Sequence, residues 1–288
     1  MVLPTLLALG LSVGSMYALF AVSFGLIFNV THIFHFAHGA VICAGGYVVF
    51  WLVSQLGWPI WAGLTIAIAV AAILGAVIEL AIYRPLRNNG APYVALFLTS
   101  VGVLIIEEGL LGAIFGPGVV VFGFLPLKSV SFGPVNVTTA NIAMLASWPL
   151  IGLTAAYMRW TRLGRFMRAV SDTPAVATNV GIDRDAIYLV AFVFGSALTV
   201  PAVLMYAWYQ GLTPMSGLST VLISSAAVII GGRGGVLPAA VAALCLGVVQ
   251  AMAIFLLPSG WQEALVFTIL LLVIVIRPQG VFARAPRW

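Results

Sequence analysis

The first twenty residues, "MVLPTLLALGLSVGSMYALF" (1–20), carry no charge and run straight into a longer apolar segment. They lack the basic flank and the small-residue cleavage pattern of a signal peptide, so we expect a retained membrane span. The whole chain shares this character: 63% of its 288 residues are hydrophobic and 7% are charged. Soluble domains carry about 25% charged residues. A chain this apolar cannot cover itself with polar surface, which places it in a bilayer.

The apolar segments predict an all-α polytopic membrane protein, organised as a single transmembrane domain over 1–288. A helix needs about 20 apolar residues to cross the hydrocarbon core of a bilayer. The segment at 219–232 is short and ends in "GGRGG", which is typical of a broken or re-entrant helix, so eight and nine crossings both stay open. The predicted segments are 3–29, 36–55, 58–82, 93–115, 140–160, 186–209, 219–232, 235–257 and 262–277.

The arginines predict the orientation of the chain. The net charge of +5 would suggest nucleic acid in a soluble protein, but here it reflects arginines collected in a few regions. These regions are the loop after the third segment, the stretch 161–185 and the C-terminus. With nine crossings all three lie on the cytoplasmic side, following the positive-inside rule. The long loop 116–139 with Lys128, and the N-terminus, then lie outside.

The three histidines of the chain, His32, His35 and His38, are each three positions from the next. Such spacing can serve a metal site or a proton relay, because residues three apart are neighbours on a helix. Zinc sites usually add a cysteine or carboxylate, and the nearest acidic residue, Glu79, is a whole span away. We therefore predict no metal and expect neutral histidines near a helix start, hydrogen-bonded to the backbone.

Glu107 and Glu108 form the second unusual feature, because they lie inside an apolar segment. A carboxylate in a membrane costs several kcal/mol unless it is neutral or partnered. Adjacent residues lie about 100° apart around a helix, so the two side chains cannot face one groove. The pair favours the function of an ion-coupled carrier. A structural role for the two glutamates is at least as well supported.

The most polar stretch, "TRLGRFMRAVSDTPAVATNVGIDRD" (161–185), predicts a short cytoplasmic helix. Asp172 or Thr173 can cap a helix whose first turn holds Pro174, and Gly181 can end it, which gives a helix at about 174–180. A solvated loop that obeys the positive-inside rule would not need such a helix. The helix therefore suits docking to a soluble partner.

The remaining sequence features predict close packing between helices and no catalytic site. Gly10 and Gly14 form a GxxxG pair, which favours close helix packing over a dimerisation role. The two cysteines, Cys43 and Cys245, sit in separate apolar stretches and predict neither a disulfide nor a thiolate metal site. The sequence holds no GxxxxGK[ST], HExxH or GxSxG motif, so we predict no catalytic residues. The chain is expected to move a substrate.

Five motifs occur in an order that resembles the branched-chain amino acid ABC transporter permeases of the Liv type, and specifically their first permease subunit. Together they cover nearly the whole chain. They are "HFAHGA" (35–40), "IELAIYRPLR" (78–87), "LTPMSGL" (212–218), "VIIGGRGGVLPAAVAALCLGVVQ" (228–250) and "RPQGVF" (277–282).

The resemblance implies a permease subunit of an ATP-driven importer in the bacterial inner membrane, surrounded by lipid. It implies a second related permease, two cytoplasmic ATPases that hold ATP and magnesium, and a periplasmic binding protein, with no cofactor and no nucleic acid bound by this chain. The implied substrates are branched-chain or other hydrophobic amino acids, with urea, amides or aromatic acids as alternatives. A proton-coupled carrier that uses Glu107 or Glu108, and a structural subunit without a path, are the rival functions.

The resemblance also implies two sets of functional residues. Ala175, Ala177 and Gly181 match the spacing of a coupling element, although its glutamate is absent. The implied ATPase-coupling residues are Asp172, Thr173, Pro174, Ala175, Ala177, Gly181 and Asp183. The implied translocation-path residues are His35, Phe36, His38, Gly39, Pro214, Gly217, Gly231 and Gly232.

The chain departs from the family pattern at a few of these motif positions. His35 replaces the usual asparagine, and Arg233 stands where a small or apolar residue is usual. Gly235 and Ala239 replace a serine and a glycine of the same motif. These departures leave the substrate open.

Overall fold

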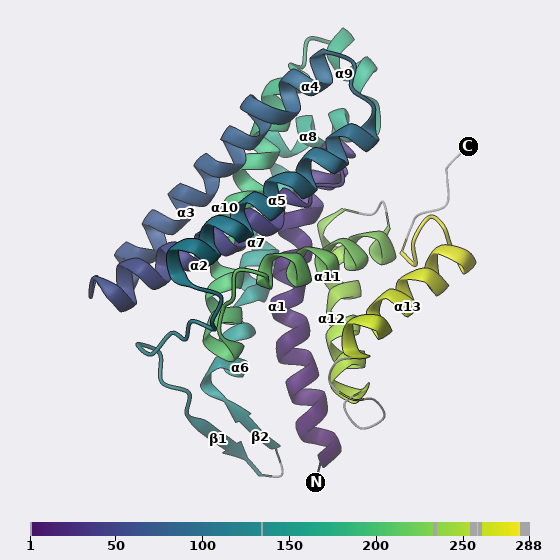
Figure 1. Ribbon diagram of the computed structural model, residues 1–288. Coiled ribbons are helices and arrows are strands. Elements are labelled where there is room, and N and C mark those ends of the chain that lie inside the picture. The colour runs from purple at the N-terminus through teal and green to yellow at the C-terminus, as the bar shows by residue number, and fades with distance from the viewer. Residues whose placement is uncertain (1, 134, 233–234, 254–257, 259–260, 283–288) are drawn as a thin grey trace.

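The computed structural model describes residues 2–133, 135–232, 235–253, 258 and 261–282, and its regular secondary structure there is helical apart from one small hairpin (Figure 1). Helices dominate because each helix satisfies its own backbone hydrogen bonds, as a bilayer requires. The elements are α1 (Val2–Thr31), α2 (Ala37–Val49), η1 (Phe50–Gln55), α3 (Ile60–Val77), η2 (Ile78–Tyr83), α4 (Arg84–Asn88), α5 (Tyr93–Phe115), β1 (Ser129–Phe132), β2 (Val135–Thr138), α6 (Thr139–Met144), α7 (Ser147–Trp160), α8 (Arg162–Asp172), α9 (Pro174–Asn179), α10 (Arg184–Gln210), α11 (Ser216–Gly231), α12 (Val236–Ala253) and α13 (Gln262–Ile276).

Each predicted apolar segment contains a helix in the described part of the chain, although residues 254–257 of one segment lie outside that part. Seven helical stretches among the described residues are long and apolar enough to cross a membrane. The shorter α11 is one continuous, largely buried helix of 16 residues that crosses α1 obliquely (Figure 1). The segment 140–160 is instead divided into α6 and α7.

Helix α1 is the central element of the bundle and packs against α7, α10, α11 and α12. Its glycine pair meets α12 inside this chain: a Cβ on Gly10 would lie 2.8 Å from Cα of Val248, and one on Gly14 would lie 2.7 Å from the carbonyl oxygen of Leu244. Small residues allow this approach of two backbones. The close-packing interpretation of the GxxxG pair is therefore confirmed.

The predictions missed the hairpin of β1 and β2 and also helix α8. In the loop 116–139, β1 pairs antiparallel with β2 in the register Val130↔Val137. In the stretch 161–185, α8 precedes the predicted short helix. Its start is capped because the Thr161 hydroxyl accepts a hydrogen bond from the amide of Gly164 at 3.0 Å.

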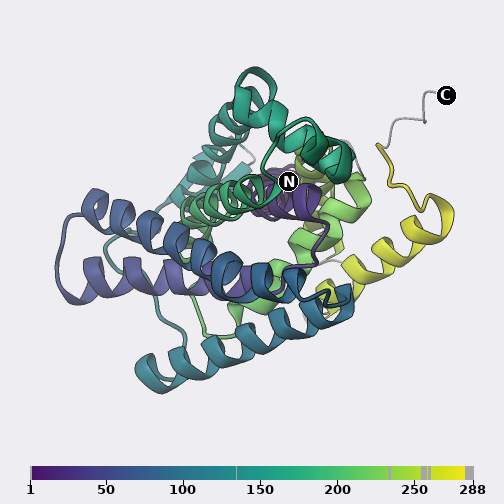
Figure 2. The ribbon, with the colours of Figure 1, turned by 90° about the horizontal axis from the view of Figure 1, so that it is seen from above.

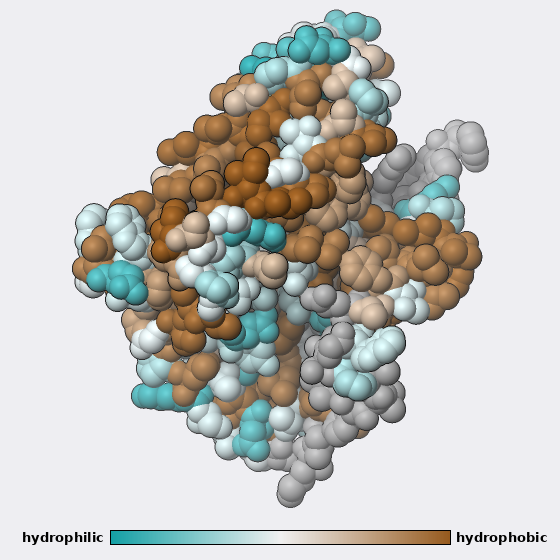
Figure 3. Space-filling model, viewed as in Figure 1, coloured by the Kyte–Doolittle hydropathy of each residue, from teal (hydrophilic) through white to brown (hydrophobic). Residues whose placement is uncertain are grey.

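The polar elements gather at opposite ends of the molecule. Helices α4, α8 and α9 lie at the upper end in Figure 1, whereas the hairpin and the N-terminus lie at the lower end. Seen from above, the helices surround α1 (Figure 2). Hydrophobic surface covers α3 and α5 between the two ends (Figure 3). The ends thus hold the two loops that the arginine pattern assigns to opposite sides of the membrane.

Candidate functional site

His35 and His38 lie in the centre of the helix bundle and are both fully buried. Nδ1 of His35 is 2.7 Å from the hydroxyl oxygen of Tyr83, at the end of η2. Nε2 of His38 is 3.0 Å from the hydroxyl oxygen of Ser23 on α1. The expectation of backbone partners is wrong for these two histidines, because other helices bring side-chain hydroxyl groups to their rings.

His32 lies apart from that pair, at the exposed end of α1. Its Nε2 is 3.1 Å from the carbonyl oxygen of Ser171 on α8, so here the expected backbone partner is present. Its φ of 55° turns the chain between α1 and α2. The three regularly spaced histidines therefore do not converge, and within the described residues no group of three or more His, Cys, Asp and Glu side chains could hold a metal ion.

Three further candidates for the translocation path lie close together where α2 crosses α11: Gly39, Pro214 and Gly217. A Cβ on Gly39 would lie 2.6 Å from the carbonyl oxygen of Gly217, and one on Gly217 would lie 2.5 Å from that of Gly39. The thiol of Cys43, one turn farther along α2, donates to the carbonyl oxygen of Pro214 at 3.6 Å. The two backbones can approach this closely only because both crossing residues are glycine.

Phe36 connects the start of α2 to α5. Its amide donates to the hydroxyl of Ser100 at 3.1 Å. Its ring packs edge-to-face on Phe97, with ring centroids 5.3 Å apart, and lies 5.7 Å from that of Phe34. Phe36 thus contributes to an aromatic cluster beside the buried histidines.

Gly231 and Gly232 lie at the opposite end of α11 from Gly217. A Cβ on Gly231 would lie 2.8 Å from the amide nitrogen of Ala239 on α12, and Gly232 packs on Gly280. The structure therefore separates these two glycines from the other path candidates. The motif at 228–250 instead contacts the motif at 277–282, because the amide of Val281 donates to the carbonyl oxygen of Ile230 at 2.7 Å. Arg233 lies outside the described residues.

An ion network that sequence reasoning missed ties η2 and α4 to the start of α10. The guanidinium of Arg87 is 2.7 Å from Glu79, which is fully buried, and 2.9 Å from Asp185. It also lies over the ring of Tyr188, 4.7 Å from the centroid. Arg84 adds a hydrogen bond of 3.0 Å to the backbone carbonyl of Asp185. The motif "IELAIYRPLR" was the available signal, since it supplies Glu79, Arg84 and Arg87 as well as Tyr83.

The predicted short helix is present as α9, Pro174–Asn179, at the upper end of the molecule (Figure 1). Thr173 is its N-cap residue, although its side chain forms no capping hydrogen bond, and Pro174 occupies the first turn. Gly181 follows with a φ of +84°, a conformation that favours glycine. The short-helix prediction is confirmed.

The other coupling candidates divide between the interior and the surface. Ala177 is buried beside Met167 and Val170 of α8, whereas Ala175 is exposed. Asp172 is the last residue of α8, and Asp183 instead caps α10, because its Oδ1 accepts hydrogen bonds from the amides of Asp185 and Ala186. The loop thus passes directly into the ion network.

Glu107 faces the interior of the bundle, one turn from Leu104, which is 2% exposed. Both carboxylate oxygens of Glu107, one of Glu108 and the hydroxyl of Tyr47 have no hydrogen-bond partner among the described residues.

A comparison with known protein families identifies the family of this chain. Residues 6–275 match the sequence model of the family described as "branched-chain amino acid transport system / permease component". The chain belongs to this family. The resemblance inferred from the five motifs is confirmed, and the permease is a multi-span membrane protein of ABC transporter permease type.

Two relatives support this assignment, and one solved structure shares the fold. The permease is 27% identical to the high-affinity branched-chain amino acid transport system permease protein LivH of Escherichia coli K12, over 96% of this chain and 94% of LivH. It is 30% identical to the corresponding protein BraD of Pseudomonas aeruginosa, over the same shares of each chain. PsaBC from Streptococcus pneumoniae, solved with a Fab, shares the fold, with a TM-score of 0.52 and 13% identity over 94% of this chain and 91% of that chain.

Replacing Tyr83 with phenylalanine should lower the stability of the permease by about 1–3 kcal/mol, because both nitrogens of buried His35 would then lack a partner. The measurement is the unfolding midpoint in detergent. Tyr157→Phe is the matched control, since Tyr157 is only half-buried. Equal midpoints for the two variants would contradict a stabilising role for the His35–Tyr83 contact.

Proposed function

We propose that this permease is one membrane half of an ATP-driven importer for branched-chain or other hydrophobic amino acids in the bacterial inner membrane. A periplasmic binding protein would deliver the substrate, a second related permease would complete the path, and two cytoplasmic ATPases would bind ATP and magnesium. The permease itself would bind no cofactor and catalyse no reaction. The names of LivH and BraD support the substrate class.

The observation that carries this proposal is a chain of contacts between an exposed helix and the buried histidines. Residues 172–183 lie at one end of the molecule and lead into the start of α10, where Asp185 binds Arg87. Arg87 binds Glu79 on η2, and the same short element ends in Tyr83, which contacts His35. A displacement of residues 172–183 would therefore be transmitted to the start of α2 through these ion pairs and the His35–Tyr83 hydrogen bond.

The transport step would use these contacts to alternate access. ATP binding closes the ATPases, the segment 172–183 moves, and the start of α2 follows. His35 and His38 would set the position of α2 from within the bundle, and Gly39 and Gly217 would let it stay against α11. Selectivity would lie mostly in the binding protein, so the path needs only a permissive lining.

The exposed face of α9 offers a direct test of ATPase docking. Val176 is 57% exposed and Val180 is 70% exposed, so glutamate at both positions should not disturb folding. Val176→Glu/Val180→Glu should abolish co-purification with the ATPases and ATP-driven uptake in proteoliposomes. Val121→Glu is the matched control, because Val121 is 61% exposed in the loop at the opposite end. Full ATPase association of the double variant would overturn the assignment of this segment.

A proton-coupled carrier is the second candidate function, and the unpartnered carboxylate of Glu107 favours it. Glu107→Gln keeps the shape of the side chain and removes its ability to carry a proton. Under the importer proposal, uptake requires ATP and survives both this substitution and collapse of the proton gradient. Uptake that needs no ATP and is lost in Glu107→Gln would replace the importer with the carrier.

A further inference from the structure

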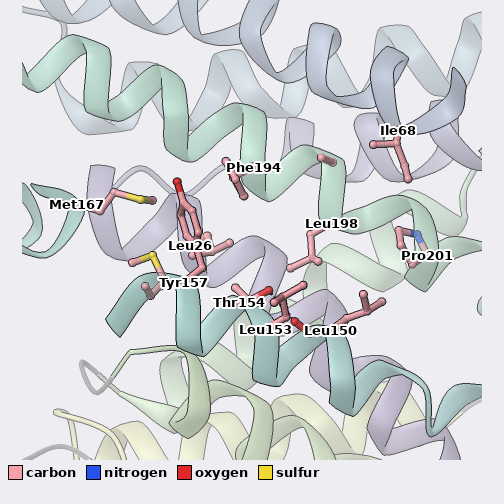
Figure 4. Close-up of a pocket in the computed structure, with 12 residues that line it drawn as sticks. Leu26, Ile68, Leu150, Leu153, Thr154, Tyr157, Met167, Phe194, Leu198 and Pro201 are labelled. Carbon is pink, nitrogen blue, oxygen red and sulfur yellow. Dashed lines mark hydrogen bonds between the residues drawn. The ribbon is translucent and has the colours of Figure 1, made fainter. Parts of the chain in front are cut away.

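A hydrophobic cavity of about 390 Å³ lies between α7 and α10 (Figure 4). Helices α1, α3 and α8 contribute the rest of its wall. Two of its lining side chains, Thr154 and Tyr157, carry a hydroxyl group, and that of Thr154 donates a hydrogen bond to the carbonyl oxygen of Leu150; the other lining side chains are apolar. Leu153 at the rim is 68% exposed, so the cavity is open to the surroundings of the bundle. In a bilayer such an opening faces acyl chains.

Four arginines surround the end of α7, next to the part of the cavity that Tyr157 and Met158 line. The guanidinium of Arg168 donates to the carbonyl oxygen of Met158, and that of Arg165 donates to the carbonyl oxygen of Trp160 at 3.4 Å. These bonds place both cations beside the cavity. The arginines of the group, all exposed, are Arg159, Arg162, Arg165 and Arg168.

None of these four arginines forms an ion pair with a carboxylate of the described residues. In the described part of the chain, the ion pairs of the arginine side chains are those of Arg87 and Arg184, which lie in the network at α10. Trp160 is 73% exposed at the same level, and tryptophan is typical of the boundary between acyl chains and headgroups. The cavity therefore ends at a positively charged headgroup level.

Helix α8 has the character of an interfacial helix. It turns Met167 and Val170 inward, whereas Leu163 is 38% exposed and Phe166 is 41% exposed among the arginines. Apolar side chains alternating with cations on an exposed helix suit a membrane surface that carries negative charge. Its inner residue Met167 also lines the cavity, which joins the charged and the apolar parts into one surface.

We propose that this cavity binds one anionic phospholipid, with an acyl chain between α7 and α10 and the phosphate group among the four arginines. The apolar wall suits a hydrocarbon chain, and the unpaired guanidinium groups supply the charge that a phosphodiester needs. A helix of a partner subunit packed here would bury unpaired cations, which is unfavourable. A zwitterionic lipid would fill the cavity but would leave the positive charge unbalanced.

Native mass spectrometry of the purified permease, titrated with phosphatidylglycerol or with phosphatidylcholine of the same acyl chains, tests the proposal. The wild type should retain the anionic lipid preferentially. Arg162→Gln/Arg165→Gln should weaken its retention about thirtyfold, because each arginine near an anionic headgroup contributes to binding. Arg277→Gln, at the end of α13, is the control for loss of an exposed arginine and should leave retention unchanged.

A second pair of variants tests the acyl-chain part of the site. Ala197→Phe places a larger side chain in the cavity from α10. Leu153→Trp covers the rim of the cavity, and folding should not be affected because Leu153 is exposed. Both should reduce retention of the anionic lipid. Equal retention of both lipids by the wild type, or unchanged retention in the arginine and cavity variants, would overturn the proposal. A cross-link from Leu153→Cys to a second permease in the assembled complex would also overturn it, because a protein would then be the occupant.

Discussion

Replacing Arg87 with alanine should abolish ATP-driven uptake and destabilise the permease by about 3–5 kcal/mol. Arg87 holds two carboxylates from different helices, at 2.7 Å and 2.9 Å. Glu79 is fully buried, so the variant leaves a carboxylate without its partner inside the protein. The cost of an isolated buried charge is much larger than the net gain from a pair. The loss of uptake follows because the start of α10 would no longer be fixed to η2.

The stability of the Arg87→Ala variant can be measured by denaturation in mixed micelles, and its function by uptake in proteoliposomes. Glu79→Gln in the Arg87→Ala background should restore part of the stability, because it removes the unpaired charge, but should not restore uptake. Arg184→Ala is the matched control. Arg184 is 38% exposed and 3.5 Å from Asp185, and an exposed pair contributes about 0–1 kcal/mol. Similar losses for Arg87→Ala and Arg184→Ala would contradict the role given to the buried pair.

Replacing Gly39 with alanine should destabilise the permease by about 1–3 kcal/mol and sharply reduce uptake. The added methyl group would lie 2.6 Å from the carbonyl oxygen of Gly217 and 3.0 Å from Cδ1 of Leu104. The carbonyl oxygen belongs to the backbone of a buried helix and cannot turn aside as a flexible side chain can. Helices α2 and α11 must therefore separate.

The matched control for this substitution is Gly102→Ala in α5. A Cβ on Gly102 would meet nothing within 4 Å, so alanine there should raise stability by up to about 1 kcal/mol through its helix propensity. The comparison uses the unfolding midpoint in detergent and uptake at equal expression. If Gly39→Ala and Gly102→Ala change the midpoint in the same direction, the close contact between α2 and α11 does not stabilise the permease as predicted.

The helices were largely predictable because the bilayer imposes a simple rule on the sequence. Segment 93–115 became α5, Tyr93–Phe115, with the predicted ends, since Pro92 precedes it and Gly116 follows. The short helix at 174–180 was predictable for a similar reason, because capping and proline signals act within one turn. In contrast, α8 was missed although Leu163, Phe166, Met167 and Val170 follow a helical period. Its arginines were interpreted only as a topological signal.

The resemblance selected a set of candidate residues, but it did not predict how they are arranged in space. The resemblance selected both His35 and Gly231, yet the structure places them in different surroundings, at the start of α2 and at the far end of α11. The ion network of Arg87 was missed as a unit because its members are separated by up to 106 positions in the chain. No pattern of local spacing reports such a contact.

The sequence by itself determined that the permease is a helical membrane protein, where its apolar segments lie, and where its short polar helix begins and ends. These properties depend on hydrophobicity and on interactions within a few residues. The tertiary structure alone decided that His35 contacts Tyr83, that Gly39 lies against Gly217, and that Arg87 joins Glu79 to Asp185. Those contacts arise from how helices pack, and packing depends on the shape of whole helical surfaces, which no single segment of sequence contains.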